Sequence, residues 1–190
     1  DVGQALVDHP QVALLSATGS TRMGQAVGPR VAARFGRSLL ELGGNNAIIV
    51  APSADLDMAV RAVAFAAAGT AGQRCTTARR LIVHADVHAD LVARLTRAFA
   101  SFTIGSPLEA GTLVGPLIDQ AAFDAMQAAL RQAQEQGGRV LVGGERALQD
   151  RYPDAHYVRP ALVDMPAQTA VVCHETFAPI LYVVQYTDLP

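Results

Sequence analysis

The sequence predicts an α/β fold in which helices flank a largely parallel β-sheet. Strand-like and helix-like hydrophobic periods alternate along the 190 residues, which is the pattern of successive β-α-β units. Residues 46–50 (NAIIV) form a continuous apolar run, typical of a strand that is covered on both faces. Hydrophobic residues make up 51% of the chain and charged residues only 17%, so the sequence can fill a core and is not that of a disordered protein.

The individual elements follow from periodicity and from glycine, proline and capping residues. We expect strands at residues 12–16, 38–42, 46–50, 80–84, 139–142, 157–163 and 180–186. We expect helices at about residues 21–35, 55–68, 87–99 and 119–136.

Three features support the predicted helices. In the first helix, Met23, Val27, Val31 and Phe35 recur every four residues and predict one buried face. The second helix begins after the capping residue Asp55 and is apolar nearly all round, so we expect it to be buried. The last helix should end at two consecutive glycines, residues 137–138.

Charge and cysteine content exclude several classes of protein. The net charge is −2 with no basic stripe, which argues against nucleic-acid binding. The longest apolar stretch, residues 62–72, is shorter than the about 20 residues needed to cross a bilayer, so we expect no membrane partner. Cys75 and Cys173 are far apart without CxxC spacing, which predicts neither a disulfide framework nor a metal site. With no signal peptide visible, a cytoplasmic location is expected.

Cys75 is the first candidate for chemistry. It lies in the segment Gly72-Gln73-Arg74-Cys75, after a predicted buried helix and two glycines, where a loop can present a side chain to a cleft. Arg74 beside it would favour the thiolate, the reactive form of cysteine. The alternative is a buried core cysteine, which is what most free cysteines are. The polar neighbours of Cys75 favour the reactive interpretation.

Glu41 is the second candidate, because it lies inside the apolar run SLLEL just before two glycines. A carboxylate there is either a strand residue on an exposed face or a general base that faces a cleft at the strand end. Alternation alone slightly favours the exposed face, since Leu39 and Glu41 share one side of the strand and Leu40 and Leu42 the other.

Two further segments have the composition of binding sites. A turn between a predicted strand and a helix contains Gly19, Ser20, Thr21 and Gly24, and the backbone N–H groups of such a turn suit a pyrophosphate. An ordinary capped helix start that binds no ligand would show the same residues. In residues 174–179 (HETFAP), Glu175 could accept hydrogen bonds from ribose hydroxyls and Phe177 could pack on a planar ring, although an ordinary turn closed by proline fits equally well.

In this order, the four segments resemble the successive signatures of the aldehyde dehydrogenase superfamily. They are TGSTxxG at residues 18–24, LELGGN at residues 40–45, GQRC at residues 72–75 and ETFAP at residues 175–179. The resemblance covers essentially the whole chain. Details such as GGNNAIIV and GQRCTTARRL resemble most closely the α-aminoadipic semialdehyde dehydrogenase (antiquitin-like) branch.

The resemblance implies a role for each matching residue. Cys75 would be the nucleophile that forms a thiohemiacetal and then a thioester, and Glu41 would activate the water that hydrolyses it. Gly19, Ser20, Thr21, Gly24, Leu42 and Gly43 would lie on the cofactor side, and Glu175 and Phe177 would hold the nicotinamide ribose and ring of NAD, with NADP as the alternative. Arg74 would pair with the carboxylate of an amino-acid semialdehyde.

The resemblance also implies how the chain is organised. Residues 1–42 would be the C-terminal part of a Rossmann-like NAD-binding domain, and residues 43–190 the catalytic domain without its C-terminal end. An asparagine oxyanion donor and a lysine for the adenosine ribose would precede residue 1, and an oligomerisation arm would follow residue 190. The parent enzyme is therefore expected to be a homo-oligomer that acts on an aldehyde, and these 190 residues alone are expected to have little or no turnover.

Three competing functions are compatible with the same residues. A CoA-acylating semialdehyde dehydrogenase would resolve the thioester with CoA and would not need Glu41. A cysteine hydrolase would pair Cys75 with His84 or His174. An inactive dinucleotide-binding or interaction module would use neither catalytic residue.

Overall fold

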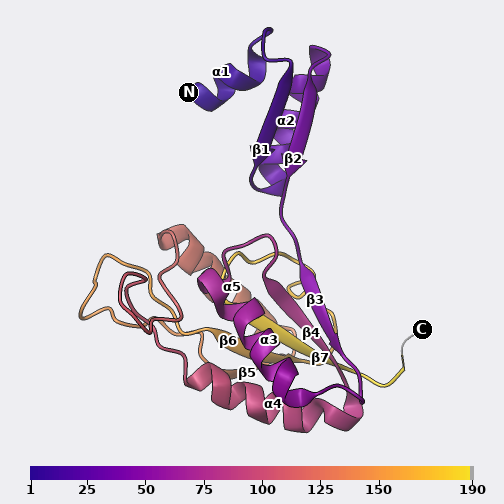
Figure 1. Cartoon of the computed structure of the whole chain (residues 1–190), viewed down its shortest axis with the longest axis vertical. Helices are drawn as coiled ribbons and strands as arrows, with labels where there is room; N and C mark the ends of the chain where they lie inside the picture. The colour runs from indigo at the N-terminus through magenta and orange to yellow at the C-terminus, as the bar shows by residue number, and fades with distance from the viewer. Residues whose placement is uncertain (189–190) are drawn as a thin grey trace. The chain divides into compact units, whose positions relative to one another are not determined.

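The computed structural model describes residues 1–188, which divide into two compact units, residues 1–44 and residues 45–188. The first unit contains α1 (Val2–Asp8), β1 (Leu14–Thr18), α2 (Thr21–Ala33) and β2 (Arg37–Glu41). Strands β1 and β2 are parallel and are connected through α2, which makes a β-α-β unit (Figure 1). Their pairing sets Thr18 opposite Glu41 at the carboxyl ends of the two strands.

The second unit is built on a five-stranded sheet with the order β3-β4-β7-β6-β5. Its strands are β3 (Asn46–Val50), β4 (Ala78–His84), β5 (Arg139–Val142), β6 (Ala161–Met165) and β7 (Ile180–Tyr186). Only β5 is antiparallel to its neighbour, so the largely parallel α/β sheet that the sequence predicts is confirmed. The helices are α3 (Leu56–Ala68), the short turn η1 (Gly69–Gly72), α4 (Ala85–Ala100) and α5 (Gln120–Glu135).

Strand β7 is the middle strand of the five, and both of its faces are buried. Ile180, Tyr182 and Val184 belong to the apolar cluster that includes α5, whereas Leu181 and Val183 belong to the cluster that includes α3 and α4. The sheet therefore separates two cores, with α3 and α4 on one face and α5 on the other. Because successive side chains of a strand point to opposite faces, its continuous apolar run fills both cores.

Several element boundaries differ from those expected. The predicted strand at residues 157–163 begins only at Ala161, directly after Pro160, which has no N–H to donate to a ladder. Tyr157 and Val158 are nevertheless buried, and Val158 forms an isolated bridge with Arg146. Helix α1 was not predicted.

Two predictions about burial were wrong. Phe35, expected to complete the buried face of α2, lies beyond the helix end with a φ of 60° and is 98% exposed; Val31 is the last buried residue of that face. Helix α3 is not buried all round, because Met58 and Phe65 are exposed while Val63 and Ala67 face the sheet. Its composition is apolar, but only one side of the helix has a sheet to pack against within the described residues.

Among residues 1–188, no helix combines the length and apolarity needed to cross a bilayer, and no group of His, Cys, Asp and Glu side chains could hold a metal ion.

Candidate active site

The first unit brings Glu41 next to the glycine-rich turn at the start of α2. Glu41 is the last residue of β2, is exposed, and its carbonyl accepts a hydrogen bond of 3.0 Å from the Gly19 N–H. Ser20 is the N-cap of α2, and its hydroxyl accepts from the Met23 N–H at 3.1 Å. Thr21 is the first residue of this 13-residue helix, whose N-terminus can attract an anion.

Gly24 brings α2 close to the residue that follows Glu41. A Cβ at Gly24 would lie 2.5 Å from a methyl carbon of Leu42, so glycine lets the Leu42 side chain pack directly against the α2 backbone. Leu42 and Gly43 follow the end of β2. The residues predicted for the cofactor side therefore gather with Glu41 at one end of the first unit.

In the second unit, Cys75 is exposed on the Cys75 loop, which we define as residues 70–77. The loop opens with three consecutive residues in the left-handed region, Thr70 (φ 56°), Ala71 (φ 53°) and Gly72 (φ 71°). This conformation costs a non-glycine residue about 1 kcal/mol or more, and such strain persists only where surrounding contacts hold it.

Gly72 is the point at which the Cys75 loop touches the ETFAP segment. A Cβ at Gly72 would lie 2.4 Å from both the carbonyl carbon and the carbonyl oxygen of Ala178. Glycine is thus required there for two reasons, its backbone conformation and this close approach.

Three polar side chains fix the rest of the loop. The Gln73 side chain donates to the carbonyl of Pro116 at 3.2 Å and accepts from the Ile118 N–H at 2.9 Å. The Asn46 side-chain amide donates to the carbonyls of Cys75, at 2.6 Å, and Thr77, at 3.0 Å. The third side chain is that of Arg79, which donates to the carbonyls of Gly72 and Arg74.

Arg79 is only 2% exposed, and its guanidinium bridges the two segments that carry predicted site residues. It donates to Gly72 and Arg74 carbonyls on one side, and on the other to the Thr176 carbonyl, at 2.7 Å, and the Glu175 carboxylate, at 3.4 Å. Burial lowers the pKa of Arg79, and the charge of Glu175 opposes that shift.

Arg74 has a different environment from Arg79. Its side chain is exposed, its Nε donates to the Thr70 hydroxyl at 2.6 Å, and its guanidinium lies 6.0 Å from the centre of the Phe65 ring. These contacts hold the Arg74 guanidinium over the start of the Cys75 loop.

Two hollows adjoin the Cys75 loop. One, of about 490 Å³, is lined by Gln73, residues 116–118 and Phe177, whose ring is 45% exposed. The other, of about 190 Å³, is lined by Phe65, Ala66, Gly69, Arg74, Thr76 and Thr77. A cofactor ring and a small substrate could therefore approach the loop from separate hollows.

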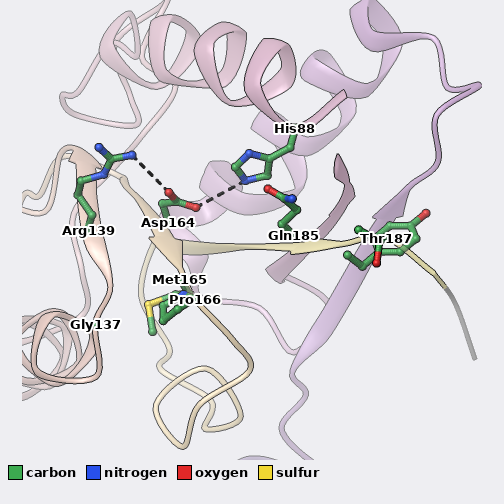
Figure 2. A pocket seen from close by; sticks show the side chains of 9 residues that line it. His88, Gly137, Arg139, Asp164, Met165, Pro166, Gln185 and Thr187 are labelled. Carbon is green, nitrogen blue, oxygen red and sulfur yellow. Dashed lines mark hydrogen bonds and ion pairs between the residues drawn. The ribbon is translucent and has the colours of Figure 1, made fainter. Parts of the chain in front are cut away.

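A larger hollow, of about 690 Å³, lies elsewhere and contains no predicted site residue. Figure 2 shows Asp164 between His88 and Arg139, with contacts of 3.5 and 3.4 Å respectively, beside the end of β7. This hollow lies at the carboxyl ends of β6 and β7, whereas the Cys75 loop lies at the amino end of the parallel strand β4.

The positions of the histidines bear on the cysteine hydrolase alternative. His84 is the last residue of β4 and caps α4, accepting from the Asp86 N–H at 3.2 Å. Cys75 precedes Ala78, the first residue of the same strand, and the six residue steps from Ala78 to His84 span about 20 Å. His84 is therefore out of hydrogen-bond reach of Cys75. His174 is exposed, and the described residues include no hydrogen bond between its ring and Cys75.

Asn46 and Arg79 were not predicted as site residues, although they lie in the motifs GGNNAIIV and GQRCTTARRL. The available signal for Arg79 was a pair of arginines near the start of a strand whose next three residues are apolar. The structure brings Cys75, Glu175 and Phe177 into one neighbourhood of the second unit, whereas Glu41 and the Gly19–Gly24 turn belong to the first.

The fold and these motifs agree with a family match over the whole chain. Residues 1–190 match the aldehyde dehydrogenase family, and the chain belongs to that family.

Among curated relatives, α-aminoadipic semialdehyde dehydrogenase of Bos taurus is 47% identical over 99% of this chain and 34% of its own length. Aldehyde dehydrogenase family 7 member A1 of Pisum sativum is 45% identical over 100% of the chain and 36% of its own length. The chain thus spans about a third of the length of these relatives.

A solved structure of betaine aldehyde dehydrogenase from Staphylococcus aureus, in complex with NAD+, is 25% identical and has a TM-score of 0.94. The similarity covers 99% of this chain and 37% of that one.

Proposed function

We propose that this chain carries the nucleophile and the general base of an NAD(P)-dependent aldehyde dehydrogenase that oxidises an amino-acid semialdehyde to a carboxylic acid. The observation that carries the proposal is Cys75, exposed on a strained loop that Gln73, Asn46 and Arg79 hold in place. Family membership and the similarity to α-aminoadipic semialdehyde dehydrogenase support it.

In the proposed reaction, the Cys75 thiolate attacks the aldehyde carbonyl carbon, and the Cys75 N–H donates to the oxyanion that forms. A bound nicotinamide would supply the hydride acceptor, and loss of hydride from the thiohemiacetal carbon would leave Cys75 as a thioester. The Glu41 carboxylate accepts a proton from water as that water attacks the thioester; the C–S bond breaks and the thiolate leaves.

The residues present fit a dinucleotide. The N-terminus of α2, beside Gly19 and Ser20, suits a pyrophosphate, and the exposed Phe177 ring beside the 490 Å³ hollow suits a planar nicotinamide. Glu175 is paired with Arg79, whose guanidinium lies 5.3 Å from the centre of that ring, and its carboxylate suits ribose hydroxyls. We propose that residues 1–42 belong to the NAD-binding domain and residues 43–190 to the catalytic domain, because the N-terminus of α2 lies in the first range and Cys75 in the second. A cytoplasmic location and a homo-oligomeric parent enzyme stay predictions.

Because the chain spans about a third of its relatives, we would test the function in a chimera in which these 190 residues replace the matching segment of the Bos taurus enzyme. Cys75→Ser should lower NADH production from α-aminoadipic semialdehyde by at least about a thousandfold. Cys173→Ser, at the other exposed cysteine, is the matched control and should leave it unchanged. Turnover that survives Cys75→Ser would refute the proposal.

Glu41→Gln separates hydrolysis from CoA acylation. If Glu41 activates water, the variant should keep a first burst of NADH but turn over slowly, with an acyl adduct on Cys75 visible by mass spectrometry. An acyl-CoA product and no dependence on Glu41 would instead identify the CoA-acylating alternative.

Arg74 provides the test of substrate class. We expect Arg74→Ala to raise KM for a carboxylate-bearing aldehyde by about 30- to 100-fold, the loss of one charge-assisted hydrogen-bonded pair. A neutral aldehyde of similar length is the control, and its KM should change little. Equal effects on both aldehydes would contradict the role of Arg74.

A further inference from the structure

Arg79 is a buried cation whose partners come from two segments that are far apart in sequence. The Thr176 and Ala178 carbonyls and the Glu175 carboxylate lie 96 to 99 residues away from it along the chain. The Gly72 and Arg74 carbonyls lie only seven and five residues before it. One planar group thus contacts both the Cys75 loop and the segment of residues 174–178.

The strand is locally irregular where Arg79 emerges. In the pairing of β3 with β4, Asn46 lies opposite Ala78 and Ala47 lies opposite Arg80, so Arg79 is the extra residue on β4. An extra residue of this kind changes the direction of its side chain, and such irregularities are common next to active sites. It directs the Arg79 guanidinium to the gap between the two segments, where the Phe177 ring lies 5.3 Å from it.

The chemistry of this position requires an arginine. Arg79 Nη1 lies within hydrogen-bond distance of the Gly72, Thr176 and Ala178 carbonyls, and Nη2 of the Arg74 carbonyl and the Glu175 carboxylate. The four N–H groups of these two nitrogens lie in one fixed plane and can reach both segments together. A lysine ammonium has three donors and no fixed plane. An ion as buried as this one is costly to desolvate, so its retention needs a reason beyond filling a core.

We propose that Arg79 is a positioning residue that holds the Cys75 loop and residues 174–178 in one fixed arrangement, so that the Cys75 sulfur and the nicotinamide end of the cofactor meet at the correct distance. The proposal rests on the proposed function, which gives Cys75 the role of nucleophile and Glu175 and Phe177 the role of cofactor contacts. Gly72, packed against the Ala178 backbone, is the other point at which the two segments meet.

The first test needs no activity. In the 190-residue chain, Arg79→Lys should increase amide hydrogen exchange in both residues 70–77 and residues 174–178, while the sheet amides of β6 and β7 stay protected. The control is Arg80→Lys, because the neighbouring Arg80 guanidinium bonds instead to the Asn45 carbonyl and the Gln168 side chain. Exchange that rises in only one segment, or equally with Arg80→Lys, would overturn the proposal. Arg79→Met, of similar length, is the second variant should Arg79→Lys fail to fold.

The second test uses the chimera with the Bos taurus enzyme and separates kcat from KM. A displacement of about 1 Å between reacting groups can cost about a hundredfold in rate, so we expect Arg79→Lys to lower kcat by up to that factor while KM for the aldehyde changes less than threefold. An unchanged kcat, or a KM effect alone, would contradict positioning.

The two proposals fail in different ways. If Cys75→Ser leaves the chimera active, the proposed function is wrong whatever Arg79→Lys does. If Cys75→Ser abolishes turnover but Arg79→Lys leaves both kcat and hydrogen exchange unchanged, the nucleophile stands and the positioning role of Arg79 is wrong.

Discussion

Single residues determine the shape of the Cys75 loop, and Gly72 is the clearest of them. Gly72→Ala would place a methyl group 2.4 Å from the Ala178 carbonyl and would also force alanine into a φ of +71°. We expect the free energy of unfolding to fall by roughly 3 kcal/mol or more, measured by urea denaturation.

The matched control for Gly72 is Gly111. Its φ is +84°, but no atom lies within 4 Å of a Cβ added there, so Gly111→Ala carries the backbone cost without the overlap. We expect it to cost about 1 to 2 kcal/mol. Equal losses at the two glycines would contradict the close approach between Gly72 and Ala178.

A second residue, Tyr182, predicts how stability changes with pH. Burial on β7 raises the pKa of Tyr182 to about 12, compared with about 10 in the unfolded chain. Below pH 10 both states hold the proton and stability is unaffected; between pH 10 and 12 only the unfolded chain releases it, so stability falls by about 2 to 3 kcal/mol.

Tyr182→Phe should therefore flatten the alkaline decline in the free energy of unfolding, followed by denaturation at pH 9 to 12. All 15 lysine and arginine residues of the chain are arginines, so no lysine titrates in this window. Tyr152→Phe, at a less buried ring, is the control. A decline that is as steep in Tyr182→Phe as in the natural chain would contradict the assignment.

Among the elements, α3 is the one that leads directly into the Cys75 loop. Its N-cap Asp55 accepts hydrogen bonds from the Asp57 and Met58 N–H groups at 2.9 and 3.1 Å. Asp55→Ala leaves these donors without their acceptor and should lower stability by about 1 kcal/mol in thermal unfolding. Asp55→Asn retains an acceptor oxygen and should recover most of the loss; if it is as harmful as alanine, the cap is not the cause.

The elements also show where sequence patterns were sufficient. Strands β3, β5 and β7 begin and end as predicted, because a mostly apolar run that lies next to polar residues, glycine or proline is a local property. Strand β6 starts four residues later than expected, because Tyr157 and Val158 are buried in a loop and not in a ladder. Apolarity indicates burial, but it does not by itself indicate hydrogen-bond pairing.

For the whole molecule, the division into two units predicts independent folding of the larger one. Both apolar clusters consist of residues from the second unit alone, whereas the first unit buries little beyond Val7 and Val31. A chain of residues 45–190 should therefore keep a cooperative unfolding transition and the same protected amides in β4, β6 and β7, measured by hydrogen exchange. A loss of protection throughout the sheet would show that the first unit is needed for its stability.

Local sequence patterns were enough to predict the class of fold, to indicate the family and to single out the two residues proposed for catalysis. Periodicity, caps and short motifs such as GQRC depend on neighbours in the chain, so they can be read without the fold. Only the tertiary structure showed that Phe35 and Phe65 are exposed, that Cys75 follows a left-handed turn, and that Arg79 is buried between two segments. These features depend on contacts with residues distant in sequence, up to 99 positions away for Arg79, and no local pattern encodes which distant groups will meet.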